Sequence, residues 1–519
     1  MTPARLASWS HWVSRSDGPG QGPEDGPTMA AVSPYDGGLS APVPAGTPAD
    51  VAAAVARARL AAPDWAALPF ESRASVVLRF HDLLVERQDE VMDVIQWEMG
   101  KARFHAWQEV LLVANLARHY AQRGASYLAD KKVRGAVPAV TKAREVRVPV
   151  GVVGIISPWN YPFYLGVGDA IPALLAGNAV IGKADPQTPL TLLWTRALMA
   201  EAGLPRSLWQ IVTGSGAEIG EAVVDNVDYV CFTGSTATGR LVGERAARRL
   251  IGSSLELGGK NPLIVRADAD IAKAARGTAE AAFANTGQMC IHIERVIVHT
   301  DVYDTFKHAL LDVTAGLRVG QAYDFSCDVG SLASAGQLAK VVAHVDDAVA
   351  KGATVLVGGR PLPEIGPFCY APTVLEGVTA EMDLCLGETF GPVIALYRVA
   401  GDEEAVAEAN RGSYGLSASI FSRDVEAADA MARRIRAGSV NINDGAAVAA
   451  GSIEAGMGGM GDSGSGRRHG AEGIRKYTQP QTIASSAMGP LGPPPGMALQ
   501  RFVRLGNAQV RLLRSLRVR

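Results

Sequence analysis

Cys290 ends a run of small and amide residues, Phe-Ala-Asn-Thr-Gly-Gln-Met-Cys at 283–290. These residue types have poor helix propensity and let the backbone turn sharply, so we expect the thiol to be presented near backbone N–H groups. A cysteine is a nucleophile only as the thiolate, and a free thiol with a pKa of about 8.5 needs help from its surroundings to reach that state. A lone cysteine is most often an inert core residue. The interpretation of Cys290 therefore depends on the motifs that accompany it.

Four further motifs occur with Cys290 in one order along the chain. They are Ser157-Pro158-Trp159-Asn160, Phe232-Thr233-Gly234-Ser235, Leu255-Glu256-Leu257-Gly258-Gly259-Lys260-Asn261-Pro262 and Glu388-Thr389-Phe390-Gly391-Pro392. Each alone is common, because glycine-rich turns and Glu-Leu pairs are frequent. Together, and in this order, they resemble the aldehyde dehydrogenase superfamily over roughly residues 40–485.

The composition fits an α/β protein with two sizeable domains. The chain has 519 residues, of which 48% are hydrophobic, and Ala, Val and Gly are abundant while aromatic residues are only 6%. A formal net charge of −2 indicates neither nucleic acid nor an anionic membrane as a partner. The five scattered cysteines suggest neither a disulfide framework nor a zinc site, and no metal is expected.

The N-terminal residues and the hydropathy of the chain indicate where in the cell the protein is expected. The N-terminal residues lack the apolar segment of a signal peptide, and nowhere do 18 apolar residues run together. We therefore expect a soluble, cytoplasmic protein.

Strand-like and helix-like patterns alternate along the chain, which predicts right-handed crossovers and a doubly wound sheet. The expected elements are helices 50–61 and 71–88, strand 150–156, helix 172–176, strand 178–182, helix 189–202, strands 208–212 and 229–232, helix 237–250, strand 261–265, helix 271–283, strand 295–299 and helix 304–317. The fingerprint G-x-G-x-x-G is absent, and the glycines of 214–220 are a weak signal. Residues 234–239 lie between a strand and a helix whose N-terminus can hold a pyrophosphate.

The resemblance implies a Rossmann-type cofactor domain, an α/β catalytic domain and a β arm that reaches another subunit, hence a homodimer or homotetramer. The expected division is a flexible leader (1–30), the cofactor-binding domain (31–140 and 151–256), the oligomerisation arm (141–150 and 460–485), the catalytic domain (257–445) and a basic tail (486–519). For 141–150 the alternative is an edge strand without a partner.

The tail allows two interpretations. Residues 484–519 hold six arginines and no acidic side chain, with apolar residues between the arginines. This pattern is compatible with a short basic amphipathic helix that meets a membrane surface or another anionic partner. A solvated or subunit-packing tail is the other interpretation and the one the sequence favours.

The resemblance also assigns the chemistry. Cys290 would attack an aldehyde carbonyl, and the oxyanion would accept hydrogen bonds from the Asn160 side-chain amide and the Cys290 backbone N–H. Once hydride has left for a nicotinamide, Glu256 would act as the general base that activates water against the thioester, its pKa raised by a semi-apolar site. The simpler alternatives are a turn role for Asn160 before Pro162 and a capping or ion-paired role for Glu256.

Cofactor choice depends on the segment Lys183-Ala184-Asp185-Pro186. In the family Lys183 reaches the adenosine ribose, and members that prefer NAD often carry a glutamate three residues later, where this chain has Pro186. A carboxylate there would repel a 2′-phosphate, so its absence predicts NADP+ with NAD+ tolerated, although Asp185 could still point at the ribose. The other expected cofactor contacts are Trp159, Asn160, Gly234, Ser235, Leu257, Glu388 beside the nicotinamide ribose and Phe390 beside its ring.

The sequence gives two answers for the aldehyde. The closest likeness, spread over SPWNYP, ALLAGNAV, GSTATG, GSSLELGGKNP, GMGGMG and SGSGRRHG, is to NADP-dependent succinate-semialdehyde dehydrogenases of the actinobacterial type. Well-defined succinate-semialdehyde dehydrogenases place substrate-binding arginines where this chain has Gly168 and Ala284. Arg295, Ser452 and His292 are the candidates to substitute for them. Apolar neighbours of Cys290 and Asn160 instead favour an apolar or aromatic aldehyde; they are Met289, Ile291, Tyr161, Phe163, Tyr164 and Leu165.

Two other classes of protein could share this pattern. A non-catalytic binding protein on the same fold would be expected to lose Cys290, Glu256 or Asn160, and all three are present. Acylating relatives pass the acyl group to coenzyme A and characteristically lack the glutamate, so Glu256 favours hydrolysis to the acid.

Overall fold

The structure is a computed structural model that describes residues 27–137, 140–487, 489 and 492–515. The chain forms two compact units, one of residues up to Tyr127 together with Pro149–Thr478, the other of Leu128–Val148 and Gln479 onward. Most of the leader predicted for residues 1–30 lies outside the described residues. Its last part, Thr28–Met29 (β1), pairs with Val43–Pro44 (β2).

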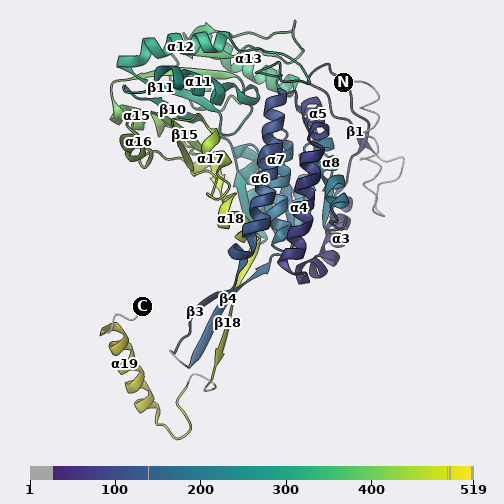
Figure 1. Cartoon of the computed structure of the whole chain (residues 1–519), viewed down its shortest axis with the longest axis vertical. Coiled ribbons are helices and arrows are strands. Elements are labelled where there is room, and N and C mark those ends of the chain that lie inside the picture. Colours follow the sequence, from purple (N-terminus) through teal and green to yellow (C-terminus); the bar gives the residue numbers. More distant parts are fainter. Residues whose placement is uncertain (1–26, 138–139, 488, 490–491, 516–519) are drawn as a thin grey trace. The chain divides into compact units, whose positions relative to one another are not determined.

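The first sheet of the larger unit has the strand order β17-β9-β8-β5-β6-β7 (Figure 1). Five strands are parallel, and the short β17 (Gly464–Ser465) runs antiparallel to β9. The parallel strands are β5 (Val152–Ile156), β6 (Ala179–Lys183), β7 (Trp209–Val212), β8 (Tyr229–Thr233) and β9 (Gly252–Glu256). The chain leaves β5 towards β6 and β7 and then returns to β8 and β9, so the order reverses beside β5, where α/β sheets bind ligands.

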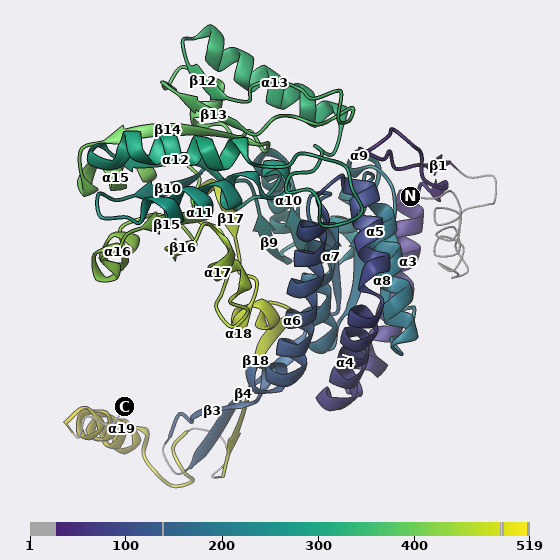
Figure 2. The same cartoon turned by 45° about the horizontal axis from the view of Figure 1, so that its top comes forward.

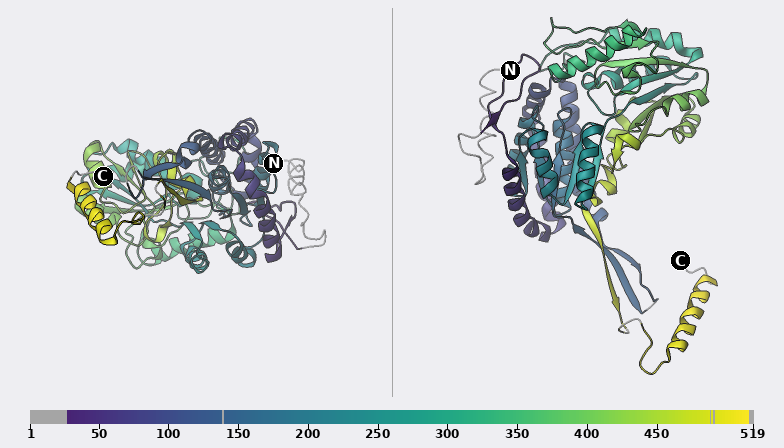
Figure 3. Two further views of the ribbon diagram at one scale, coloured as in Figure 1. Left: turned by 90° about the horizontal axis from the view of Figure 1, so that it is seen from below. Right: turned by 180° about the vertical axis from the view of Figure 1, so that it is seen from behind.

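Helices cover both faces of this sheet because its central strands are buried on both sides. The helices α7 (Pro162–Leu175) and α8 (Pro189–Glu201) make the crossovers from β5 to β7, whereas α9 (Gly216–Asn226) and α10 (Thr236–Arg248) lead to β8 and β9. The view from behind shows that helices lie on that side of the larger unit too (Figure 3). The N-terminal helices α3 (Pro48–Ala67), α4 (Phe70–Glu86), α5 (Gln88–Met99) and α6 (Arg103–Leu128) complete the layers.

The second sheet has the order β12-β13-β14-β11-β10-β15-β16, parallel except for β12 (Figure 2). Its strands are β10 (Asn261–Val265), β11 (Ile293–His299), β12 (Thr354–Val357), β13 (Thr373–Glu376), β14 (Val393–Val399), β15 (Ser417–Phe421) and β16 (Ser439–Ile442). Alternate residues of one strand enter different cores, as the pleat requires. Leu263 and Val265 pack in one core, and Ile264 packs in another.

Helices again lie on both faces of the second sheet. The core around Leu263 includes residues of α11 (Ile271–Phe283) and α12 (Tyr303–Ala315), and the core around Ile264 includes residues of α15 (Asp402–Ala409) and α16 (Val425–Ala432). The remaining helices of this region are α13 (Ala335–Ala350), α14 (Asp383–Leu386) and α17 (Ala447–Gly451).

The smaller unit contains a three-stranded sheet of order β18-β4-β3 and the helix α19. The bounds are β3 (Lys131–Arg134), β4 (Thr141–Pro149), β18 (Thr478–Ser486) and α19 (Leu499–Ser515). The boundaries of the arm in the structure differ from those predicted from the sequence. Residues 128–134, expected in the cofactor domain, belong to this unit, and residues 460–477, expected in the arm, belong to the larger unit with β17 and α18 (Gly470–Arg475).

Several elements differ from the sequence prediction, and three of them lie in or beside the first sheet. Helix α7 begins ten residues before the predicted 172–176, because its burial along the whole length outweighs the low helix propensity of its glycines. Helix α9 was not predicted, although Ser215 and Glu218 form a capping box at its start. Strand β9, which carries Glu256, was also missed. None of the helices within the described residues is long and apolar enough to cross a membrane.

Candidate active site

Cys290 follows a tight turn between α11 and β11. The 3-10 helix η1 (Ala284–Gly287) contains Asn285 and Thr286 at φ of 50° and 57°, followed by Gly287 at 70°. Three successive left-handed residues reverse the chain sharply, as the sequence predicted. A Cβ atom at Gly287 would collide with the carbonyl oxygen of Gly391, so this position needs glycine.

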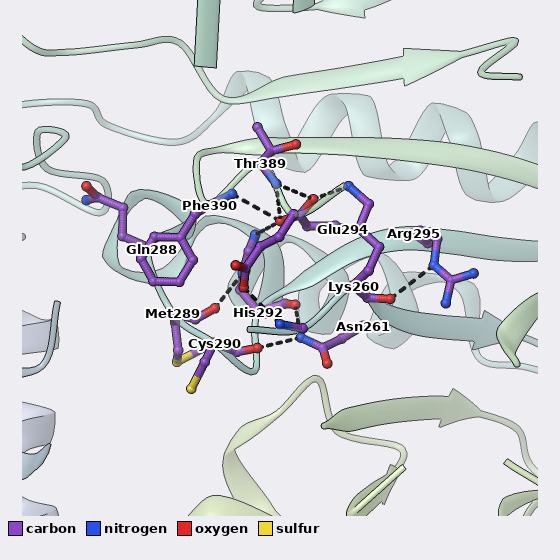
Figure 4. Close-up of polar contacts among 12 residues, drawn as sticks. Lys260, Asn261, Gln288, Met289, Cys290, His292, Glu294, Arg295, Thr389 and Phe390 are labelled. Atoms are coloured by element: carbon purple, nitrogen blue, oxygen red, sulfur yellow. Dashed lines mark hydrogen bonds and ion pairs between the residues drawn. The ribbon is translucent and has the colours of Figure 1, made fainter. Parts of the chain in front are cut away.

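Side-chain amides hold the Cys290 loop (Figure 4). Asn261, the first residue of β10, donates from Nδ2 to the carbonyl oxygens of Cys290 at 2.8 Å and His292 at 2.7 Å. Gln288 donates from Nε2 to Asn285 O at 3.1 Å and accepts from Ala333 N at 2.9 Å. The loop is therefore fixed on both sides of the half-buried Cys290.

Asn160 is tied to this loop. It follows β5, is 4% exposed, and donates from Nδ2 to Gln288 O at 3.0 Å, two residues before Cys290. Its own carbonyl accepts from Lys101 Nζ at 2.8 Å and from Asn285 Nδ2 at 3.1 Å. A side-chain amide has two N–H donors, so one remains for a further acceptor.

Glu256 ends β9 and is 6% exposed, and its buried Oε1 has no hydrogen-bond partner among the residues that the structure describes. Burial raises the pKa of Glu256 to about 7, against the lowering effect of Arg468 and Lys476. Burial raises the pKa of Cys290 to about 12, and the charges of Glu256 and Glu388 act in the same direction. A Cβ atom at Gly259 would lie 2.7 Å from the Cys290 carbonyl oxygen, so the segment that follows Glu256 lies directly against the Cys290 loop. From the sequence, we expect surroundings that lower the pKa of this thiol, whereas the residues around Cys290 raise it.

A buried ion cluster that the sequence did not reveal lies beside Glu256. Arg468 donates from Nε and Nη2 to Asp169 Oδ2 at 2.9 and 2.8 Å, and from Nη2 to Thr233 Oγ1 at 2.6 Å. Thr233 is the register partner of Glu256. Lys476 Nζ donates to Asp169 Oδ1 at 2.9 Å. The available signal was a lone aspartate within the otherwise uncharged run 162–175.

Three residues of the expected nicotinamide region lie around the loop that follows β9. Gly259 N donates to Glu388 Oε1 at 2.9 Å, and a Cβ atom at Gly258 would lie 2.6 Å from Glu388 Oε2. The Trp159 and Phe390 rings meet edge to face at 5.5 Å between centroids. Leu257 N donates to Ser463 O at 3.0 Å. Glycine thus lets Glu388 approach the segment that carries Glu256.

Glu294, also not anticipated, fixes the turn that carries Phe390 (Figure 4). It accepts from Thr389 N at 3.0 Å and Phe390 N at 3.1 Å, and it pairs with Lys260. Burial alone would raise the pKa of Glu294, but Lys260 and His292 outweigh it and hold that pKa far below its usual range. Phe390 has φ of 59°, a strained value that these contacts maintain.

The expected adenosine and pyrophosphate contacts lie at the carboxyl ends of neighbouring parallel strands. Lys183 ends β6 and is 3% exposed, and Ala184, Asp185 and Pro186 follow it. Asp185 accepts from Gln187 N at 2.9 Å within its own turn. Gly234 and Ser235 connect β8 to α10, where Ser235 Oγ accepts from Thr238 N at 3.3 Å as the N-cap.

This arrangement suits a dinucleotide. A helix N-terminus opens directly after β8 and offers free N–H groups to a pyrophosphate, and a buried lysine ends the strand on the other side of β5. Glu388 and the Trp159–Phe390 pair lie near Cys290 and Glu256, where a nicotinamide would be needed.

The residues considered for a substrate carboxylate are mostly engaged elsewhere. Arg295 is 2% exposed and donates to the backbone carbonyls of Lys260, Glu408 and Ala409. His292 lies between Met289 O and Glu294. Ser452 is exposed and donates to Val448 O at 2.8 Å. Arg295 and His292 are therefore corrected to structural roles.

Comparison with known proteins identifies the family. Residues 22–483 match the model of the aldehyde dehydrogenase family. The chain belongs to the aldehyde dehydrogenase family. Its aldehyde dehydrogenase fold has strong counterparts among solved structures.

Three relatives of this aldehyde dehydrogenase family chain are informative. A Mycobacterium ulcerans protein with the provisional name succinate-semialdehyde dehydrogenase (NADP+) is 48% identical over 472 residues, 91% of each chain. The NAD-dependent aldehyde dehydrogenase of Sinorhizobium meliloti is 35% identical with a TM-score of 0.87, covering 91% of this chain and 94% of that one. The succinate-semialdehyde dehydrogenase of Burkholderia pseudomallei is 32% identical with a TM-score of 0.85, covering 89% and 95%.

Proposed function

We propose that this protein oxidises succinate semialdehyde to succinate with NADP+ through a covalent intermediate on Cys290. The observation that carries the proposal is the convergence of Cys290, Asn160 and Glu256 from three separate elements. Asn160 binds the loop two residues before Cys290, and the segment that follows Glu256 binds the Cys290 carbonyl through Asn261 at 2.8 Å. We assign these three residues the catalytic roles, and Trp159, Lys183, Ala184, Asp185, Pro186, Gly234, Ser235, Leu257, Glu388 and Phe390 the cofactor contacts.

The residues support a two-stage reaction. The Cys290 sulfur adds to the aldehyde carbonyl, and the free N–H of Asn160 stabilises the oxygen as it becomes negative. Bound NADP+ would supply the hydride acceptor and a positive charge that favours the thiolate. Glu256, whose pKa of about 7 suits a general base at neutral pH, then takes a proton from the water that attacks the thioester and releases the acid.

The structure near Lys183 supports the preference for NADP+. Pro186 places no carboxylate in the turn after β6, and Asp185 has one oxygen committed to Gln187 N. Lys183 remains as the cation beside this turn. The name of the mycobacterial relative agrees with this preference, whereas that of the Sinorhizobium structure indicates that the fold also serves NAD.

The substrate assignment is supported by the names of two relatives. Both the mycobacterial and the Burkholderia proteins carry the succinate-semialdehyde name.

The second candidate is an apolar aldehyde. A side chain at Gly168 would contact Tyr164 and Leu116. At this position, where well-defined succinate-semialdehyde dehydrogenases are expected to carry a substrate-binding arginine, this chain therefore has an apolar surface.

We also propose a homodimer or homotetramer in the cytoplasm. The arm strand β3 is exposed throughout and β18 is exposed from Gln479 onward, and Val133, Val148 and Ile483 are exposed apolar residues. Such strands and side chains are commonly covered by another subunit.

Kinetics with matched aldehydes test the substrate. We expect kcat/KM for succinate semialdehyde to exceed that for butanal, which has the same carbon chain without the carboxylate, and kcat/KM with NADP+ to exceed that with NAD+. Alkylation of Cys290 by iodoacetamide should abolish both activities. A higher value for butanal or benzaldehyde would select the apolar candidate, and a strict requirement for coenzyme A would reject hydrolysis.

A further inference from the structure

Helix α19 has a continuous apolar half. It is 17 residues long and exposed along nearly its whole length. At 3.6 residues per turn, its large apolar side chains fall within an arc of about 180°. In order around the arc they are Leu512, Leu505, Phe502, Leu513, Leu499, Val510 and Val503. Gln509 is the one polar side chain within this arc of α19.

The other half of α19 is cationic. Arg514 lies at one border of the apolar arc and Arg501 at the other, with Arg504 and Arg511 between them. Arginines at the border of an apolar face can lay their aliphatic stems along it and raise their guanidinium groups to a charged surface. Since residues 484–519 contain no aspartate or glutamate, no carboxylate of this segment neutralises these charges.

Charge is segregated along the whole chain. The formal net charge of −2 includes the six arginines of residues 484–519, so the rest of the chain carries −8. An average over the chain hides this separation of an acidic body from a basic end, which indicates an anionic partner for the end alone.

We propose that α19 is an in-plane anchor that docks the enzyme on anionic lipid surfaces. Its apolar half would enter the boundary between headgroups and acyl chains, and its arginines would meet the lipid phosphates. Nucleic acid would satisfy the arginines but leave the apolar half in water. A neighbouring subunit could cover the apolar half. Such packing would not explain why the other half of α19 carries four arginines and no acidic residue.

Sedimentation with lipid vesicles tests the anchor in the full chain. We expect binding to vesicles of phosphatidylcholine mixed with phosphatidylglycerol, weak binding to phosphatidylcholine alone, and weakening by salt. Each arginine contributes on the order of fivefold to partitioning. The combined variant Arg501→Gln, Arg504→Gln, Arg511→Gln and Arg514→Gln should therefore lose at least about 100-fold, and a chain that ends at residue 498 should not bind.

A matched control separates docking from general charge. The combined variant Arg79→Gln, Arg248→Gln, Arg360→Gln and Arg433→Gln removes as many exposed arginines elsewhere and should keep binding. Aldehyde oxidation by the shortened chain should be unchanged, which shows that it is folded. Failure of the full chain to bind anionic vesicles, or binding that survives the shortening, overturns the proposal. A smaller oligomer on shortening, without vesicle binding, would assign α19 to subunit packing.

Discussion

At the scale of single residues, Glu256 has opposite effects on the two halves of the proposed reaction. Its charge adds to burial in raising the pKa of Cys290, which disfavours the nucleophile. Its own raised pKa makes it a base for the later hydrolysis. The unpartnered Oε1 is the corresponding structural sign, because buried polar atoms seldom lack a partner and a water molecule could supply one.

The variant Glu256→Gln should therefore change two measurements in opposite directions. Steady-state acid formation should fall by about 100- to 10,000-fold because the base is lost. Alkylation of Cys290 by iodoacetamide should become faster at a given pH, because one of the charges that raise its pKa is removed. In the unchanged enzyme, activity should decline as the pH falls through about 7, where Glu256 becomes protonated.

The control for this change is Glu280→Gln on the exposed side of α11. It should leave both rates as they are. A Glu256→Gln enzyme with normal turnover would remove Glu256 from the catalytic mechanism.

Sequence alone was enough to propose the catalytic residues, but it did not reveal the residues that support them. Cys290, Asn160 and Glu256 each lie in a short sequence motif, and a thiol, an amide and a carboxylate are the residue types that the proposed chemistry needs. Glu294 and the Asp169–Arg468 pair act through contacts across 95 and 299 positions of the chain, which no local spacing encodes. Arg295 is the reverse case: its type suggested an anion site, and only its backbone partners show that it is structural.

At the scale of elements, the strand ends place the site. Ile156, Lys183, Thr233 and Glu256 end four neighbouring parallel strands, and predicted site residues stand at or directly after each end. Apolar runs made these strands predictable to within one or two residues, apart from β9. Sequence could not give the start of α7, because burial along the whole helix outweighs the low helix propensity of its glycines. It could not give the boundaries of the arm either, because these depend on contacts between residues far apart in the chain.

The turn before Cys290 depends on Gly287. In Gly287→Ala the new Cβ would meet Gly391 O at a φ of 70°, where an L-residue costs about 1–2 kcal/mol even without a clash. We expect urea denaturation to show a lower free energy of unfolding, and turnover to fall because Cys290 moves. Gly220→Ala, inside α9 with open space around it, should instead be neutral or stabilising by up to about 1 kcal/mol. Equal effects of the two changes would contradict the role of the turn.

At the scale of the whole molecule, the segment after β17 joins distant parts of the larger unit. β17 pairs with β9, Arg468 and Lys476 bind Asp169 of α7, and Tyr120 of α6 donates to Gly470 O at 3.1 Å. Asp169 is 1% exposed and faces two cations, so its charge is required for theirs to be buried.

Asp169→Asn should be strongly destabilising because it leaves Arg468 and Lys476 without their carboxylate. We expect urea denaturation to show a loss of about 3–5 kcal/mol, against at most about 1 kcal/mol for Asp225→Asn in the exposed pair with Arg245.

The same charge predicts a pH dependence. Burial alone would raise the pKa of Asp169, but Arg468 and Lys476 outweigh it and hold the pKa well below its usual range. The stabilisation is therefore present above the unfolded value of about 4 and is lost as the pH falls below it. An Asp169→Asn protein as stable as its parent would show that this cluster contributes nothing to folding.

The direct connection between the two sheets limits how this enzyme can be altered. β9 ends at Glu256 and β10 begins at Asn261, whose side-chain amide donates to the Cys290 carbonyl. Only residues 257–260 therefore separate the proposed base from this amide. Lengthening this connector by even one residue would change the span between the water-activating group and the sulfur. Protein engineers who wish to graft new substrate ranges onto this scaffold should therefore diversify other loops and leave this one at its native length.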